Sequence, residues 1–210
     1  SMRRRLVDII GGAAYRVPIY TFHGFCNEII KKYPESFPRI IGSHNLGEID
    51  QLRIMERIID NTKLVLLRPY GNPYFYVQPT LSMIKALKRE GIGVKELKRL
   101  CISQAHDLKN ADTHHTGGPY KGKLKASYLA AKKRLEKNKE LLVLYEKYEA
   151  ALAKERLYDY EDMIIEVVKA FKGDKDLLQQ VQEEYLYILA DEHQDANNAQ
   201  NQVLELLSGF

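Results

Sequence analysis

The clearest candidate for chemistry is a short acidic string at 191–195, which reads Asp-Glu-His-Gln-Asp. It directly follows the apolar run 185–190, whose length and composition predict a strand buried on both faces of a parallel sheet. Open α/β sheets place their chemistry at the carboxyl ends of such strands. Asp191 could hold Mg²⁺ through its oxygen atoms, and Glu192 could orient or deprotonate an attacking water. Acidic turns also end many strands that have no catalytic role, so this pair alone leaves both interpretations open.

Three longer strings make the pattern specific. Residues 21–26 read Thr-Phe-His-Gly-Phe-Cys, 157–164 read Leu-Tyr-Asp-Tyr-Glu-Asp-Met-Ile, and 191–200 read Asp-Glu-His-Gln-Asp-Ala-Asn-Asn-Ala-Gln. In this order they resemble motifs of the UvrD/Rep/PcrA group of superfamily 1 DNA helicases, the last being motif II, the Walker B element. The sequence departs from the motif II pattern at His193 and Ala196, neither of which is a magnesium or water-activating position. The resemblance covers essentially the whole chain.

For the acidic string the resemblance implies nucleotide chemistry. Asp191 would coordinate the Mg²⁺ bound to ATP, and Glu192, also at the nucleotide, would activate the hydrolytic water. Gln194 would help couple the nucleotide state to the rest of the motor. ATP and Mg²⁺ are therefore the expected cofactors.

For the first string the resemblance implies contact with single-stranded DNA. Thr21, Phe22 and His23 would touch the strand through phosphate or base-stacking contacts. Two of them have structural alternatives, because Thr21 can cap a helix and Phe22 can be a core aromatic at a helix start. Asp159, in the second string, is expected to cap its helix rather than to act in catalysis.

No Gly-x-x-Gly-x-Gly-Lys-(Ser/Thr) phosphate loop occurs in the 210 residues, and no second motor domain follows the acidic string. We therefore interpret the chain as an internal fragment of a 3′-to-5′ ATP-dependent DNA helicase or translocase, inactive by itself. One alternative is part of an AddA/RecB-like helicase–nuclease. Another is a non-catalytic nucleic-acid-binding module, against which the intact Asp191-Glu192 pair argues. Expected partners are single-stranded DNA and single-strand/duplex junctions, with the fragment monomeric.

The elements that must position these residues are mostly helices. Hydrophobic periodicity and Gly/Pro punctuation predict helices at 3–10, 22–32, 46–59, 79–89, 94–108, 123–156, 160–171, 174–183 and 198–207. The runs 15–20 and 185–190 are the strand candidates. Along the longest helix the expected apolar stripe is Tyr128, Ala131, Leu135, Leu142, Tyr145 and Leu152.

The expected fold is thus mainly α. A helical inserted subdomain, called 1B in the family, would occupy 34–156. A partial α/β RecA-like motor domain, called 1A, with a few parallel strands would be formed by 1–33 and 157–210.

Charge is distributed unevenly along the chain. The net charge is +4, and residues 157–210 hold three basic and twelve acidic side chains, so 1–156 carries +13. Such a basic surface attracts polyanions, although each lysine could simply solvate a helix. The basic side chains concentrate on two segments: Lys85, Lys88, Arg89, Lys95, Lys98, Arg99, and then Lys121, Lys123, Lys125, Lys132, Lys133, Arg134.

Composition excludes several classes of protein. Apolar residues make up 45% of the chain, enough for a packed core and against gross disorder. No run approaches the about 20 apolar residues of a membrane helix. The two cysteines, Cys26 and Cys101, cannot form a disulfide framework or a four-ligand zinc site, which favours a reducing, cytoplasmic setting.

Overall fold

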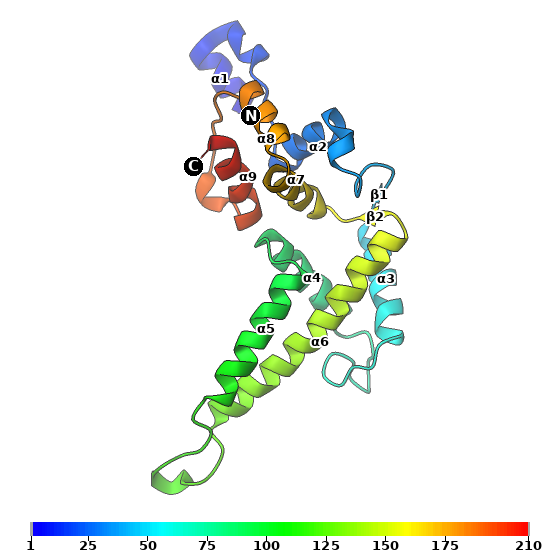
Figure 1. Cartoon of the computed structure of the whole chain (residues 1–210), viewed down its shortest axis with the longest axis vertical. Helices are drawn as coiled ribbons and strands as arrows, with labels where there is room; N and C mark the ends of the chain where they lie inside the picture. The colour runs from blue at the N-terminus through cyan, green and yellow to red at the C-terminus, as the bar shows by residue number, and fades with distance from the viewer. Residues whose placement is uncertain (1, 210) are drawn as a thin grey trace.

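The structure, a computed structural model, describes residues 2–209, and helices dominate it (Figure 1). In chain order the elements are α1 (Met2–Ile10), η1 (Gly11–Arg16), α2 (Phe22–Lys32), η2 (Pro34–Ser36), β1 (His44–Asn45), α3 (Glu48–Asp60), α4 (Val77–Arg89), α5 (Val94–Lys109), η3 (Gly118–Tyr120), α6 (Ala126–Lys154), β2 (Leu157–Tyr158), α7 (Asp162–Gly173), α8 (Lys175–Glu184), η4 (His193–Asp195) and α9 (Asn198–Ser208). In the described part, no helix is both long and apolar enough to cross a bilayer.

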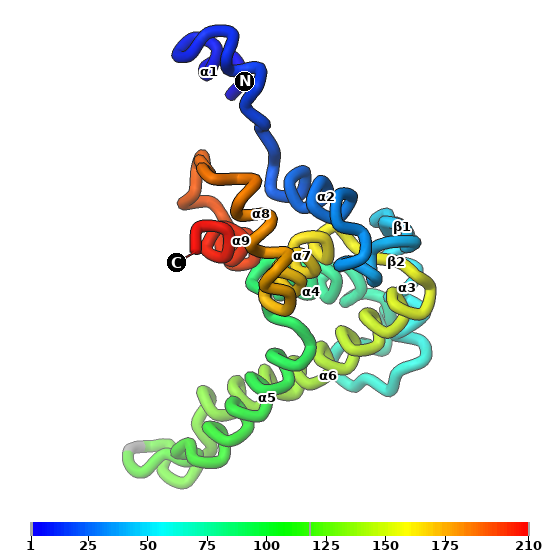
Figure 2. The backbone as a smooth tube through the Cα atoms, turned by 45° about the horizontal axis from the view of Figure 1, so that its top comes forward, coloured from blue at the N-terminus to red at the C-terminus, as the bar shows by residue number. Residues whose placement is uncertain are grey.

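Helices α3 to α6 form one unit, here called the arm (residues 46–157). Its core is a continuous apolar cluster that includes Met55, Ile59, Ile84 and Leu144, all nearly inaccessible to solvent. Helices α5 and α6 pack along each other and are joined by the loop 110–125 at the tip of the molecule, while α3 and α4 lie beside the other end of α6 (Figures 1 and 2).

Helices α2, α7, α8 and α9 form the second unit, here called the head (residues 22–40 and 158–207). Its separate core is built around Cys26, Ile29, Val167 and Phe171. Helix α7 lies at the centre, in contact with α2, α8 and α9. The head is therefore assembled from two stretches of chain that flank the arm in sequence.

The chain crosses between head and arm at two short parallel strands. β1 pairs with β2, with His44 opposite Leu157 and Asn45 opposite Tyr158. The amide N–H groups of His44 and Leu46 donate to the carbonyls of Arg156 and Tyr158 at 2.9 Å. The mainly α fold with parallel strands is thus confirmed, and the two strands lie where the chain passes between head and arm.

Both sequence-predicted strands are wrong in this structure. Residues 15–20 form the end of η1 and an extended link, and 185–190 form an extended segment between α8 and η4. A strand needs backbone partners, and within residues 2–209 the only sheet is the β1–β2 pair. The predicted double-sided burial is also wrong, since Tyr187 is 92% and Leu189 95% exposed.

Most helices were predicted within a few residues, and the inner face of α6 was predicted in part. Leu135, Tyr145 and Leu152 are buried as expected, and the core side also includes Leu144 and Tyr148.

The segment between α3 and α4 is held by one carboxylate of α6. Glu140 accepts hydrogen bonds from the backbone N–H groups of Val65, Leu66 and Leu67 at 2.8–3.1 Å.

We predict that Glu140→Ala lowers the free energy of unfolding by about 1.5–3 kcal/mol, because hydrogen bonds from several N–H groups to a charged acceptor are lost together. Chemical denaturation of the chain measures this. Glu136→Ala is the matched control, since Glu136 on the same helix makes only an i,i+3 surface pair with Lys139 and should change stability by at most about 0.5 kcal/mol. Equal effects of the two substitutions would contradict the role given to Glu140.

Candidate functional site

The first motif lies at the start of α2. Thr21 is the N-cap residue, and its Oγ1 accepts a hydrogen bond from the N–H of Gly24 at 3.0 Å. A Cβ at Gly24 would come within 3.2 Å of that same Oγ1, so a small residue suits this close turn. The structural alternative for Thr21 is therefore realised, and its side chain is still exposed at the positive end of the helix dipole.

Phe22 and Cys26 face the head core. Phe22 is half-buried against that cluster, so the structural alternative for this ring is also realised. Cys26 is fully buried, and burial raises the pKa of its thiol to about 12. A thiol protonated at neutral pH is a core residue and not a nucleophile.

His23 joins the first motif to the second. Its imidazole stacks on the ring of Tyr160, with 3.6 Å between centroids and 15° between planes. Burial lowers the pKa of His23 below its ordinary value of 6.5. Tyr160 is 50% exposed, so the pair presents an aromatic face to solvent. Tyr160 lies in the second motif, but the sequence alone gave no role to this residue. The only signal that could have marked it was an aromatic side chain placed between polar residues.

The segment that carries Tyr160 is fixed by two aspartates. The N–H of Asp159 donates to Asp162 Oδ2 at 3.0 Å, and the N–H of Asp162 donates to Asp159 Oδ1 at 3.1 Å. This reciprocal pair caps the start of α7, as expected for Asp159. Both aspartates are only 1% exposed, so their charges need partners inside the protein.

The main partner is Lys88, at the end of α4 in the arm. Its Nζ lies 2.6 Å from Asp159 Oδ2, 2.7 Å from Asp162 Oδ1 and 2.7 Å from Glu149 Oε1 of α6. Burial alone would lower the pKa of Lys88, but these carboxylates raise it well above its ordinary value. Burial raises the pKa of Asp159 to about 6, although Lys88 acts in the opposite direction.

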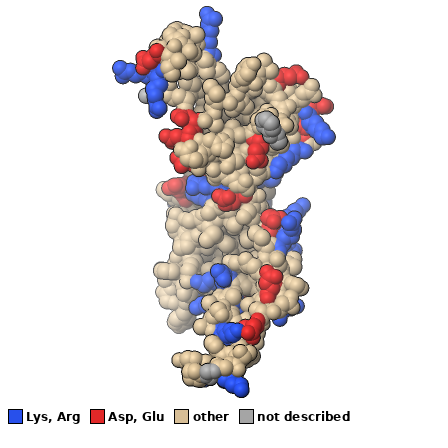
Figure 3. All heavy atoms as spheres, turned by 90° about the vertical axis from the view of Figure 1, so that its left-hand side faces the viewer, with Lys and Arg blue, Asp and Glu red and all other residues tan. Residues whose placement is uncertain are grey.

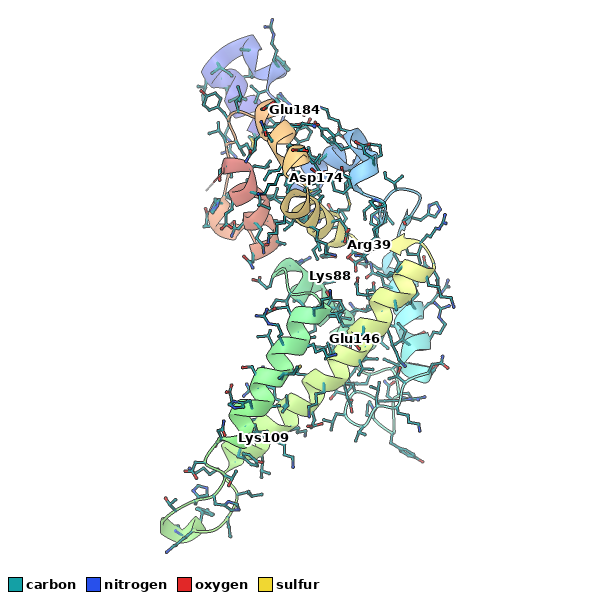
Figure 4. All side chains as sticks on the ribbon, in the orientation of Figure 1. Arg39, Lys88, Lys109, Glu146, Asp174 and Glu184 are labelled. Atoms are coloured by element: carbon teal, nitrogen blue, oxygen red, sulfur yellow. The ribbon has the colours of Figure 1, made fainter. Side chains whose placement is uncertain are left out.

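Arg39 completes this cluster from the turn before β1. It bonds Glu149 at 2.8 Å, Asp162 at 3.4 Å and Glu166 at 3.0 Å. The oxygens of Glu149, Asp159 and Asp162 all lie within 4.8 Å of one another, a spacing that could hold a metal ion. The ammonium of Lys88 occupies that position, and Figure 4 shows Lys88 and Arg39 at the level where arm and head meet.

The acidic string lies elsewhere on the head, between α8 and α9. Asp191, Glu192 and Gln194 are all exposed, and Glu192 has a left-handed backbone with φ 51°. Within residues 2–209, no hydrogen bond or ion pair joins these side chains to Thr21, Phe22 or His23. The adjacent carboxylates are a donor set suited to Mg²⁺, with oxygens free to reach it.

Two further residues of the acidic motif have a visible structural role. Asn197 and Gln200 form a capping box at the start of α9, in which each side chain bonds the other's backbone N–H at 3.0 Å. This part of the motif therefore builds the helix that follows the exposed carboxylates.

Comparison with known proteins agrees with this arrangement of motifs. The chain belongs to the UvrD/REP helicase family, since the family model of the UvrD/REP helicase N-terminal domain matches residues 1–209. The resemblance drawn from the three motifs is thereby confirmed.

Individual relatives are distant in sequence. The chain is 24% identical to the ATP-dependent DNA helicase PcrA of Staphylococcus aureus (strain Mu50), and 25% identical to PcrA of Bacillus subtilis (strain 168). It is 25% identical to a probable DNA helicase of Mycoplasma pneumoniae. Each similarity covers 99% of this chain, but only 23% of either PcrA and 33% of the Mycoplasma protein. The chain thus spans less than half the length of these relatives.

We predict that Tyr160→Ala raises the pKa of His23 toward 6.5, because removing the stacked ring uncovers the imidazole and relieves the burial that lowers this pKa. NMR titration of the ring protons of labelled histidine measures it. Tyr70→Ala is the control, since Tyr70 is a fully exposed tyrosine of the arm. An unchanged His23 pKa in Tyr160→Ala would show that the stack is not what buries the ring.

Proposed function

We propose that the chain is part of an ATP-dependent DNA helicase or translocase, of the 3′-to-5′ type that the family resemblance implies. The observation that carries this proposal is the stacked pair of His23 and Tyr160 beside the N-terminus of α2, in a chain matched over 1–209 by a helicase domain. Two motifs from distant parts of the sequence meet there and leave an aromatic face exposed.

On the DNA side, the half-exposed ring of Tyr160 offers a base a surface for stacking. The exposed hydroxyl of Thr21 and the start of α2 lie beside it and suit a phosphate. Phe22 acts through packing, holding α2 on the head core. We propose single-stranded DNA and single-strand/duplex junctions as the partners of this surface.

On the nucleotide side, we propose that Asp191 binds the Mg²⁺ of ATP and that Glu192 accepts a proton from the attacking water. Gln194, three positions after Asp191, would help couple the nucleotide state to the rest of the motor. The adjacent exposed carboxylates support this assignment. The ion would neutralise the charge that develops on the phosphates.

We further propose that 34–156 is the inserted helical subdomain and that 1–33 and 157–210 belong to the motor domain. The separate cores of arm and head support this division. Phe37 and Ile40 pack in the head core, so the packing favours a first crossing a few residues later, near β1. A monomeric state and a reducing, cytoplasmic location are also proposed, the latter supported by both cysteines being free.

We predict that Glu192→Gln abolishes ATP hydrolysis and spares ATP binding, because the amide keeps the size of the side chain but cannot accept the proton. The measurement needs the longer protein in which this segment is joined to a phosphate loop; the 210-residue chain alone should show no turnover. Glu205→Gln, an acidic residue of α9 away from the string, is the control. Wild-type turnover in Glu192→Gln would remove Glu192 from the mechanism.

We predict that the arm binds DNA without sequence preference and chiefly through phosphates. Figure 3 shows Lys and Arg atoms at several points of the arm down to its tip. If about four phosphates are contacted, the slope of log K against log salt should be about −3 to −4.

Reversing the exposed Lys132, Lys133 and Arg134 to glutamate should weaken binding and flatten that slope. Fluorescence anisotropy with a labelled single-strand/duplex junction measures both quantities. Reversal of Arg3, Arg4 and Arg5, which changes the charge of α1 by the same amount, is the control. Binding that ignores salt would sink the idea.

A further inference from the structure

The start of α7 depends on a cation from the other unit of the fold. Asp159 and Asp162 bond each other's backbone N–H groups and are almost completely buried. Two carboxylates this close repel each other unless a positive charge lies between them. That charge is Lys88 Nζ, 2.6 and 2.7 Å from one oxygen of each, and Lys88 comes from α4 of the arm.

Tyr160 lies inside the segment that this cation fixes. Its neighbour Asp159 is bound by Lys88, and its other neighbour Glu161 is bound by Arg89, the next residue of α4, at 3.1 Å. Both sides of Tyr160 are therefore tied to the end of α4. Because Tyr160 stacks on His23, this attachment also sets where the imidazole and the tyrosine ring face each other.

The end of α4 is itself held against the head by a second contact. Asn198 Nδ2 of α9 donates to the carbonyl of Glu90 at 2.9 Å. Gly91, which follows α4, has φ +70°, a backbone conformation that favours glycine, and it lies next to the side chain of Gln202 of α9. The end of α4 that carries Lys88 is therefore in contact with both α7 and α9.

We propose that Lys88 is a positioning residue for the nucleic-acid surface: its ammonium holds the Asp159–Asp162 cap and thereby holds Tyr160 against His23. This inference rests on the proposed function only in the use of that surface for DNA. Lys88 does not touch DNA itself, since it is 1% exposed, and this removes it from the basic surface predicted from the sequence.

The test uses the whole chain and Lys88→Met, which removes the ammonium and keeps an apolar chain of similar length. The first readout is NMR of the His23 ring protons without DNA, which a ring stacked at 3.6 Å shifts upfield. Lys88→Met should lose this displacement. Lys85→Met, one turn earlier on α4 and without an ion pair to any residue described here, should keep it.

A second control separates positioning from stability. Glu149→Gln weakens the same cluster from α6, and Glu149 bonds Lys88 and Arg39 rather than the segment 157–162. It should lower the thermal midpoint and leave the His23 displacement in place. If the displacement instead falls in Glu149→Gln in proportion to lost stability, or persists in a folded Lys88→Met, the proposal is overturned.

If Lys88→Met does not fold, Lys88→Gln takes its place, because it also removes the charge and leaves both aspartates in the cluster, and it carries the same two outcomes. The second readout is the affinity for labelled oligothymidylate. Lys88→Met should bind about tenfold more weakly than Lys85→Met, the value of one lost stacking contact, and adding Tyr160→Ala should cost nothing more. A wild-type chain that does not bind would defeat the proposed DNA surface, while the NMR readout would still decide the role of Lys88.

Discussion

The arrangement of the whole molecule depends on one buried charge, the ammonium of Lys88 among the carboxylates of Glu149, Asp159 and Asp162. Burying an unpaired charge is expensive, so neither the lysine nor the aspartates can occupy their sites alone. Glu149 and Lys88 belong to the arm, and the aspartates belong to the head. The lysine of the arm therefore neutralises the aspartates of the head. This buried ion-pair cluster links two units whose hydrophobic cores are separate.

This link affects the two candidate sites differently. The start of α2 and the start of α7 are fixed by caps, by core packing and by Lys88, so Thr21, His23 and Tyr160 have defined neighbours. Asp191 and Glu192 follow an extended segment that makes no sheet within residues 2–209. The surface proposed for nucleic acid is thus held by several contacts within this chain, whereas the acidic string is held mainly by the capping box of α9 that follows it.

The sequence predicted the helices because their information is local. Thr21 before α2, the absence of Gly and Pro in α6 and the glycines after α4 each act within a few residues. It failed at 185–190, because an apolar run becomes a strand only beside another strand, which periodicity cannot reveal. His23 and Tyr160 stack although they lie 137 positions apart in the chain, and Lys88 bonds Asp159 across 71 positions. The pattern of a single sequence does not reveal such long-range pairs.

The basic residues of 34–156 fall into two groups, which the net charge of the segment does not distinguish. Several basic residues of 34–156 pair with acidic residues of 157–210: Lys88 with Asp159 and Asp162, Arg39 with Glu166, and Arg89 with Glu161. Lys88 and Arg89 hold the head on the arm, whereas the Arg39–Glu166 pair lies within the head, and the charges of all three basic residues are largely neutralised by these partners. The exposed basic side chains toward the far end of the arm, such as Lys132, Lys133 and Arg134, have no such partners within the described residues. The exposed, unpaired basic charge therefore lies toward the far end of the arm, where DNA binding is proposed, while the same sign of charge at the end of α4 serves the fold.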